Sequence, residues 1–279
     1  MLRVVIEYTN EGEESMTDTG TSGQAPLLRC EGVSKAFGAV HALYRVDFEV
    51  RAGEVMALVG DNGAGKSTLI KGIVGIYPFD EGTTFFDGKS VKIHGPRAAA
   101  ALGIEVVYQD LALADNLDVV ANMFLGRERL RRGVLDEVSM EQQARETLES
   151  LKVTTLRSVR QTVAGLSGGQ RQAVAVAKAI MWGDSKLVIL DEPTAALGVA
   201  QTRQVLDLVG RLAEQGYAVV LISHNLHDIF EVADRITVLR LGQQVAVMDR
   251  RSCTQQDVVH AITAGEMKFV PGMDEDVAS

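Results

Sequence analysis

The stretch that decides the fold is Gly60-Asp61-Asn62-Gly63-Ala64-Gly65-Lys66-Ser67-Thr68, which has the pattern GxxxxGK[ST]. The apolar run before it, 54–59, is typical of a buried strand, and residues 69–75 after it are typical of a helix. Between a strand and a helix, glycines let the backbone curl so that several N–H groups point into one concavity. The positive end of the following helix also attracts anions. The stretch therefore predicts a phosphate-binding loop; the alternative is a glycine-rich turn with an incidental Lys-Ser.

Two residues of this loop, Lys66 and Ser67, place a charge and a hydroxyl where phosphates would lie. The ammonium group of Lys66 can reach the β- and γ-phosphates of a nucleoside triphosphate, and the Ser67 hydroxyl can ligate Mg²⁺. The loop therefore predicts a site for a nucleoside triphosphate with Mg²⁺. We expect nucleotide contacts from all of its residues: Gly60, Asp61, Asn62, Gly63, Ala64, Gly65, Lys66, Ser67 and Thr68.

The composition is that of a soluble globular protein, with 46% hydrophobic and 23% charged residues among 279. No apolar run in the sequence approaches the roughly 20 residues that a membrane-spanning helix needs, and residues 1–8 do not resemble a secretory signal. The two cysteines, Cys30 and Cys253, are too far apart in sequence to suggest a disulfide framework or a metal site. This cysteine usage suits a reducing cytosol.

The negative charge of the chain is concentrated at its two ends. The formal net charge is −9, and most of the excess acidic residues lie in 1–24 and 269–279. The near-neutral body has no broad basic surface of the kind that binds nucleic acid, so we expect no nucleic-acid partner. Residues 1–26 are expected to form a disordered acidic tail, and 266–279 a second, flexible acidic tail.

Strands and helices alternate along the body of the chain. Apolar runs of strand length at 54–59, 104–108, 187–190 and 218–222 alternate with helical stretches at 69–75, 96–102, 171–182 and 199–215. This alternation predicts an α/β fold with a mostly parallel sheet that is covered on both faces. Strands before the phosphate loop, and a hairpin signal at Asp87-Gly88, add an antiparallel part.

Residues 111–165 differ in character from this body. They show no clear strand, and helical apolar spacing occurs at 119–125 and 140–151. We interpret them as a helical insertion between two parts of the core, 27–110 and 166–265. The basic cluster 127–132 between these helices is interpreted as a solvated surface, with a partner-contacting patch as the alternative.

Polar residues follow two of the buried strands at their carboxyl ends, which is the edge of a parallel sheet where ligands bind. Asp191 can hold Mg²⁺ there through water, beside Ser67, and a helix cap is the alternative. Glu192 lies where a group must orient or deprotonate the water that attacks the γ-phosphate, and a surface glutamate is the alternative. His224 can contact the γ-phosphate and hold Glu192 in place, and polar filler at a strand end is the alternative.

A second segment suited to phosphate binding is Leu166-Ser167-Gly168-Gly169-Gln170. It opens a helix and offers a hydroxyl, two glycine N–H groups and the positive helix end. One chain does not need two such surfaces for one γ-phosphate, whereas two chains arranged head to tail do. Each nucleotide would then lie between the phosphate loop of one chain and this segment of the other.

This second segment resembles the LSGGQ signature of ATP-binding cassette (ABC) ATPases. The phosphate loop, Gln109, Asp191-Glu192-Pro193-Thr194 and His224 occur around it in the order of that family, and the resemblance covers about residues 27–265. It implies an ABC ATPase domain with a P-loop NTPase (RecA-like) core, an antiparallel β subdomain and an inserted α-helical subdomain at 111–165. It also implies a dimer that holds two ATP molecules, with these signature residues acting in trans: Ser167, Gly168, Gly169 and Gln170.

The same resemblance implies roles for two further residues and shows one departure. Gln109 is similar to the glutamine that touches Mg²⁺ or its water and couples to a membrane partner. Phe37 is similar to the aromatic residue that stacks on adenine, and a core residue is the alternative. Gly198 departs from the family, which usually has an aspartate after the leucine found here at position 197. The missing carboxylate normally communicates between the two sites.

The finer resemblance is to the bacterial ribose, xylose and fructose import ATPases, in Val107-Tyr108-Gln109, Asn122-Met123-Phe124-Leu125-Gly126 and 191–198. It implies an ATPase that powers sugar import with a second copy of itself, membrane permease subunits and, indirectly, a secreted or periplasmic sugar-binding protein. It also implies a cytoplasmic location, peripheral on the inner face of the cell membrane. The alternatives are a soluble ABC ATPase acting on DNA, ribosomes or cofactor assembly, an export ATPase, and a regulatory module that holds ATP without useful turnover.

Overall fold

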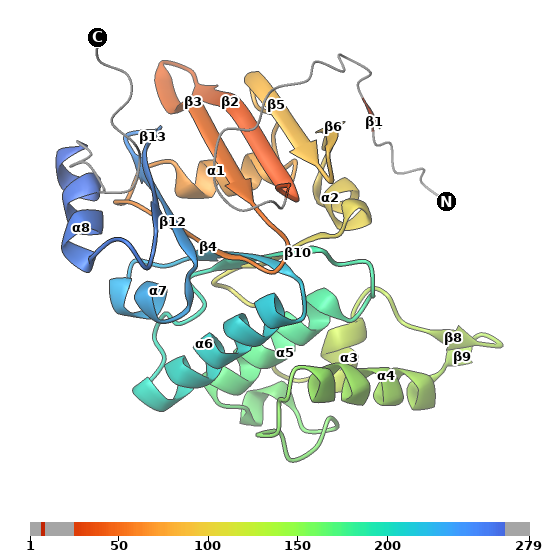
Figure 1. Cartoon of the computed structure of the whole chain (residues 1–279). Coiled ribbons are helices and arrows are strands. Elements are labelled where there is room, and N and C mark those ends of the chain that lie inside the picture. Colours follow the sequence, from red (N-terminus) through yellow and green to blue (C-terminus); the bar gives the residue numbers. More distant parts are fainter. Residues whose placement is uncertain (1–6, 9–24, 266–279) are drawn as a thin grey trace, which may run out of the picture.

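The computed structural model describes residues 7–8 and 25–265, which form two main β-sheets and a set of helices (Figure 1). The larger sheet has the strand order β13-β12-β4-β11-β10-β7, and the other has the order β1-β6-β5-β2-β3. The strands of the larger sheet are β4 (Val55–Val59), β7 (Ile104–Val107), β10 (Leu187–Asp191), β11 (Ala218–Ile222), β12 (Arg235–Arg240) and β13 (Gln243–Asp249). Those of the second sheet are β1 (Glu7–Tyr8), β2 (Leu28–Phe37), β3 (Val40–Val50), β5 (Glu81–Phe86) and β6 (Lys89–Lys92).

The helices lie on both sides of the larger sheet. On the side of the second sheet are α1 (Lys66–Ile73) and α2 (Pro96–Leu102). The helices whose buried residues pack in the core on the opposite face are α3 (Val119–Phe124), α4 (Glu137–Ser150), α5 (Gly168–Ile180), α6 (Val199–Glu214), α7 (Leu226–Val232) and α8 (Gln255–Ala264).

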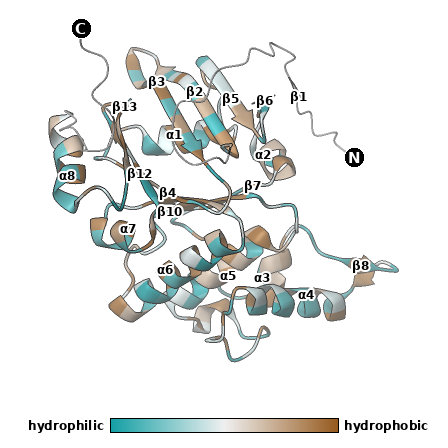
Figure 2. Cartoon of the chain, viewed as in Figure 1, coloured by the Kyte–Doolittle hydropathy of each residue, from teal (hydrophilic) through white to brown (hydrophobic). Residues whose placement is uncertain are grey.

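The larger sheet is parallel except for the β12–β13 hairpin at its edge. Its central strands are apolar on both faces, as Figure 2 shows for β4 and β10, because both faces are covered by other elements. Along β4, Ala57 packs in the core beside α5 and α6, whereas Met56 and Leu58 pack in the core beside α1. The predicted α/β fold with a mostly parallel sheet and an antiparallel part is confirmed.

Two local predictions are confirmed in the antiparallel region and beside it. Strands β5 and β6 pair antiparallel, with Thr84 opposite Val91. Asp87 and Gly88 between them have φ angles of 52° and 73°, the positive values that a tight hairpin turn of this kind requires. Helix α2 spans the predicted residues 96–102 and ends at Gly103, which has a left-handed φ of 88°.

The predicted acidic tails, 1–26 and 266–279, lie outside the described residues except for 7–8 and 25–26. Residues 7–8 differ from the expected disordered tail, because they form the short strand β1. This strand pairs antiparallel with β6, Glu7 opposite Lys92 and Tyr8 opposite Val91. The free edge of β6 offers backbone hydrogen-bonding groups, and a nearby extended segment satisfies them whatever its side chains are.

The segment 111–165 contains the two predicted helices, as α3 and α4, and one feature that was not predicted. Two short strands, β8 (Leu130–Arg131) and β9 (Val134–Leu135), form a hairpin that begins in the basic cluster, so the expectation of no strand in this segment is wrong. The turn between them has positive φ at Arg132 and Gly133. Because Leu130, Val134 and Leu135 are exposed, the hairpin lacks the buried face on which strand prediction depends.

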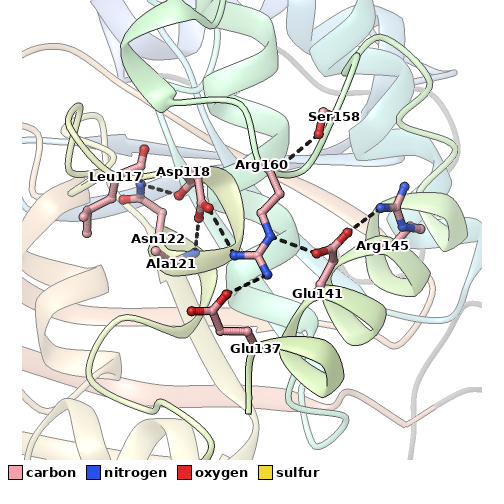
Figure 3. Close-up of polar contacts among 9 residues, drawn as sticks. All are labelled: Leu117, Asp118, Ala121, Asn122, Glu137, Glu141, Arg145, Ser158 and Arg160. Atoms are coloured by element: carbon pink, nitrogen blue, oxygen red, sulfur yellow. Dashed lines mark hydrogen bonds and ion pairs between the residues drawn. The ribbon is translucent and has the colours of Figure 1, made fainter. Parts of the chain in front are cut away.

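The guanidinium group of Arg160 joins three parts of this helical segment (Figure 3). Its Nε donates to Glu141 Oε2 over 2.8 Å, and its terminal nitrogens lie 3.2 Å from Glu137 Oε2 and 3.4 Å from Asp118 Oδ2. Asp118 caps α3 and the two glutamates belong to α4. Arg160 thereby ties both helices to the turn that precedes the signature. Exposed pairs of this kind each contribute little to stability, because water screens them.

The predicted boundaries of the helical subdomain stay a prediction, because α5 packs against both parts. It contacts α3 and α4 of the inserted segment as well as α6 and β7 of the core. Among the described helices, none combines the length and the apolar character that crossing a bilayer requires.

Candidate nucleotide site

The phosphate loop connects β4 to α1 and has a backbone that only glycine adopts readily. Gly60, Gly63 and Gly65 have φ angles of 148°, 81° and 105°. A methyl group on Gly65 would lie 2.8 Å from the Ala42 carbonyl oxygen, and one on Gly60 would collide with the carbonyl oxygen of Leu239. Gly65 is also the N-cap of α1, and within the described chain no side chain caps this end. The first N–H groups of the helix are therefore available to a ligand, as phosphate binding requires.

Lys66 holds its ammonium group against this loop. Its Nζ donates to the carbonyl oxygens of Gly60 and Asp61, over 2.5 Å and 3.1 Å. Burial lowers the pKa of Lys66, and the nearby charges of Glu192, Asp61 and Asp191 act in the opposite direction. The ammonium group is thus partly desolvated and close to carboxylates, an environment typical of a cation that binds an anionic ligand.

A cleft of about 1010 Å³ opens over the loop, at the upper end of the range for ligand sites. The carboxyl ends of the parallel strands bring the predicted residues to it. The predicted residues that line the cleft are the phosphate loop 60–68, Gln109, Asp191, Glu192 and His224. Sequence reasoning missed the walls that other elements supply: His41 and Ala42 on β3, and Ile262 and Thr263 on α8. Their residue types gave no signal, because they reach the cleft only through the packing of β3 and α8.

Asp191, the last residue of β10, is half-buried at the edge of this cleft. Burial raises its pKa above the ordinary value of an aspartate, while the charges of Lys66 and Lys71 lower it. The Ser67 hydroxyl and Gln109 belong to the same cleft. A hydroxyl, a carboxylate and an amide oxygen are the hard ligands that Mg²⁺ takes in nucleotide sites, usually together with phosphate oxygens and water. The residues present therefore fit ATP with Mg²⁺.

Glu192 and His224 meet in the structure although they are far apart in the sequence. Glu192 Oε2 lies 2.7 Å from His224 Nδ1. The Glu192 side chain is 18% exposed and that of His224 is 76% exposed. Glu192 also has a left-handed φ of 51°, a strained conformation that is common for residues at functional sites. The two side chains are thus in contact, as expected from the sequence, and their roles in hydrolysis stay a prediction.

The signature segment lies outside this cleft. Ser167 is the N-cap of α5, and its hydroxyl accepts a hydrogen bond from the Gln170 N–H while the Gln170 side chain accepts one from the Ser167 N–H. Gly168 lets the start of α5 approach the loop before α6, since a methyl group on it would lie 2.5 Å from Leu197 Cδ2. Gly169 lets α5 approach α6 itself, since a methyl group there would lie 3.3 Å from Gln201 Cβ. Within the described chain, the residues around the cleft do not include 167–170. The action of these residues in trans stays a prediction.

Phe37 is not itself among the residues that line the cleft, although its strand partner Val40 is. Its side chain is 48% exposed, so the alternative of a core residue does not hold. Its ring packs edge-on against Tyr77, with centroids 5.2 Å apart, and Lys35 Nζ lies 5.7 Å from its centre. Stacking of Phe37 on adenine stays a prediction.

Comparison with known proteins places the chain in one family. The family model described as ABC transporter matches residues 43–195. The fructose import ATP-binding protein FrcA of Rhizobium meliloti is 46% identical over 250 residues, which cover 87% of this chain and 96% of that protein. The xylose/arabinose import ATP-binding protein XylG of Sulfolobus acidocaldarius is 43% identical, with coverage of 85% and 94%.

A solved structure agrees with this assignment. The ADP conformation of an ATP-binding cassette of an ABC transporter superposes with a TM-score of 0.71 at 27% identity, covering 86% of this chain and 95% of that chain. This chain and the solved cassette thus share the fold that carries the phosphate loop, the cleft and the signature described above. The chain belongs to the ABC transporter family, as an ATP-binding cassette with ATPase activity.

Proposed function

We propose that this ATPase powers the import of a sugar through a membrane permease. The observation that carries the proposal is the likeness to the fructose import protein, which is 46% identical and extends over 96% of that protein's length. The xylose/arabinose import protein supports the same class of cargo. The chain would act in the cytoplasm, peripheral on the inner face of the cell membrane, bound to permease subunits that receive the sugar from a secreted or periplasmic binding protein.

The cleft residues account for ATP hydrolysis at this site. Lys66 and the N–H groups of the phosphate loop bind the β- and γ-phosphates. Glu192 orients or deprotonates the attacking water, and His224 holds Glu192 in position. Ser67, Asp191 through water, and Gln109 would hold Mg²⁺, which would neutralise phosphate charge when bound. Because the sheet fixes the loop and the strand ends, the backbone at these residues is set before the nucleotide arrives.

A second copy of the chain would complete the site. The signature residues 167–170 do not line the cleft of their own chain, as far as the structure describes it. In a head-to-tail dimer, Ser167 and the N–H groups of Gly168 and Gly169 would face the γ-phosphate on the other chain. ATP binding would then join the two chains, and hydrolysis would release them.

The test is transport by the assembled complex. The chain is co-expressed with candidate sugar permease subunits and a candidate binding protein and placed in liposomes, and ATPase rate and sugar uptake are measured together. We expect the sugar-loaded binding protein to stimulate both, and Glu192→Gln to abolish both while an ATP-bound dimer accumulates. Sugar efflux would favour the export alternative. Co-purification with ribosomes, together with an ATPase rate that ignores sugar, would favour the soluble alternative.

A further inference from the structure

One buried carboxylate, that of Asp228 on α7, joins the two segments that carry Glu192 and His224. Asp228 is only 2% exposed. Its Oδ2 accepts a hydrogen bond from Thr194 Oγ1 over 2.7 Å, and its Oδ1 accepts one from Asn225 Nδ2 over 2.8 Å. Each oxygen thus serves a different partner, and the partners are separated by 31 positions in the sequence.

Both partners lie directly beyond the residues of the cleft. Thr194 is two residues after Glu192, in the loop from β10 to α6. Asn225 is the residue after His224 and the N-cap of α7, where its side chain also accepts the N–H of His227 over 3.1 Å. The Asp228 carboxylate therefore fixes the spacing of the two segments immediately behind the 2.7 Å contact between Glu192 and His224.

Both cleft residues depend on contacts from other parts of the chain, and the Glu192 N–H also donates to the Ile222 carbonyl oxygen over 2.9 Å. The His224 side chain is 76% exposed, so packing does not fix its place. The backbone of Glu192 has a φ of 51°, which persists only where neighbouring contacts enforce it. In the described chain, Asp228 forms no ion pair, and its recorded side-chain partners are both neutral. Burying a carboxylate in this way is costly unless its hydrogen bonds are kept, so breaking the bonds to Thr194 and Asn225 is unfavourable.

We propose that Asp228 is a positioning residue for ATP hydrolysis. It holds the Thr194 segment and the Asn225 segment together, and so keeps Glu192 aimed at the attacking water with His224 behind it. This inference rests on the roles proposed above for Glu192 and His224. The plain alternative is that Asp228 only stabilises the start of α7, and the two readings predict different kinetics.

The experiment measures kcat and KM for ATP in the full-length chain, with thermal unfolding as the check on folding. We expect Asp228→Ala and Thr194→Val to lower kcat about tenfold, as loss of a buried hydrogen bond allows, with KM changed less than about twofold. Asp228→Asn should keep kcat within about threefold, because an amide can accept from Asn225 and donate to the Thr194 hydroxyl. Thr194→Ser should do the same.

The matched control is Asp136→Ala. Asp136 also serves a helix start, where it accepts the Ser139 N–H over 3.2 Å at the beginning of α4, but it does not line the cleft. We expect this variant to lose stability without changing kcat. A double variant adds a sharper readout. The kcat of Asp228→Ala combined with His224→Ala should be no lower than that of His224→Ala alone, because each change releases the Glu192 carboxylate from its position.

Several results would overturn the proposal. They are wild-type kcat in Asp228→Ala or Thr194→Val, a loss in Asp228→Asn as large as in Asp228→Ala, and losses that multiply in the double variant. If Asp228→Ala does not fold, Thr194→Val decides by itself. Full turnover by Glu192→Gln would remove the proposed role of Glu192 and this inference with it. An inactive Glu192→Gln beside a fully active Thr194→Val would reject this inference alone.

Discussion

Two helices of the molecule, α1 and α5, both begin at a glycine-rich segment suited to phosphate, but only one of them is capped. At α1 the N-cap is Gly65, in a left-handed conformation and without a side-chain hydrogen bond in the described chain. At α5 the N-cap is Ser167, which forms a reciprocal capping box with Gln170. The first N–H groups of α1 depend on a ligand or water, whereas one of those at α5 is already satisfied within the chain.

The glycines of the two segments also serve different purposes. In the phosphate loop, Gly60 and Gly65 have positive φ and lie against backbone carbonyl groups that cannot move aside. At the start of α5, Gly168 is helical, and it makes room for the flexible end of Leu197. Glycine thus provides conformation in the first segment and close helix packing in the second. The first segment has the backbone of a phosphate-binding loop, and the second is a capped helix start whose action in trans stays a prediction.

The largest expected effect concerns the phosphate loop. Lys66→Ala removes the cation that touches the loop carbonyls, and we expect the Kd for ATP of the isolated chain to rise about 100-fold, the equivalent of one strong charge-assisted contact. Titration with a fluorescent nucleotide measures it. Lys71→Ala, on the same helix but outside the cleft lining, is the control and should bind normally. Equal affinity in both variants would contradict phosphate binding at this loop.

A smaller effect is expected at the capped helix. Ser167→Ala removes the cap of α5, which should lower the free energy of unfolding by about 1 kcal/mol and Tm by roughly 2–4 °C. Nucleotide affinity of the isolated chain should stay within about twofold, because Ser167 does not line the cleft. Thermal unfolding and the same titration measure the two quantities. Weaker ATP binding by the isolated chain would remove the contrast between the segments.

The site around the phosphate loop should also contain a destabilised charge, that of Asp191, before a nucleotide binds. Burial raises the pKa of Asp191, so its ionised form is destabilised in the folded chain. Asp191→Asn should therefore raise the Tm of the nucleotide-free protein at pH 7, by at most a few degrees since the group is half-exposed. Activity should be lost, because the Mg²⁺ ligand is gone.

The pH dependence of that Tm difference has a definite sign. Below the ordinary pKa of 3.8, Asp191 is protonated in both the folded and the unfolded chain, and the amide brings no advantage. As the pH rises through the raised folded pKa, ionisation of Asp191 lowers the folding stability of the wild-type chain but not that of the variant. The Tm difference should therefore grow from acidic to neutral pH in unfolding scans. A difference that shrinks toward pH 7 would reject the assignment.

The smallest effect is expected at Gly198, the N-cap of α6 beside the signature. Its backbone is extended, with φ −76° and ψ 160°, and nothing lies within 4 Å of an added side chain. Gly198→Asp should cap α6 and add a few tenths of a kcal/mol, or about 1 °C in Tm. Gly198→Ala is the control and should bring no such gain. A Tm below wild type in the aspartate variant would show that this end is closed to a cap.

Local sequence was enough for much of the fold and for the cleft. The turn at Asp87-Gly88 and the limits of α2 follow from residues with special φ preferences. Buried apolar runs imply a parallel sheet, so the sequence predicts that one edge of it carries the phosphate loop, Asp191, Glu192 and His224. The β8–β9 hairpin escaped prediction, since its strands have two residues each and no buried face.

Other features depended on distant packing. Phe37 could be matched to an adenine-stacking residue by its place in the sequence, but its packing against Tyr77 beside the cleft depends on the fold. The walls at His41 and Thr263 come from elements whose own patterns carry no sign of a ligand. The pairing of residues 7–8 with β6 likewise depends on an edge that another part of the chain provides.

The amino-acid sequence by itself determined the phosphate loop, its strand and helix, and the residue types that serve phosphate and Mg²⁺, because φ preferences and periodicity act over a few residues. Tertiary structure alone decided that Asp228 joins the segments behind Glu192 and His224, and that the signature lies outside the lining of its own chain's cleft. These contacts follow from the strand order β4-β11-β10, which is set by the burial of the whole sheet and not by any single stretch of it.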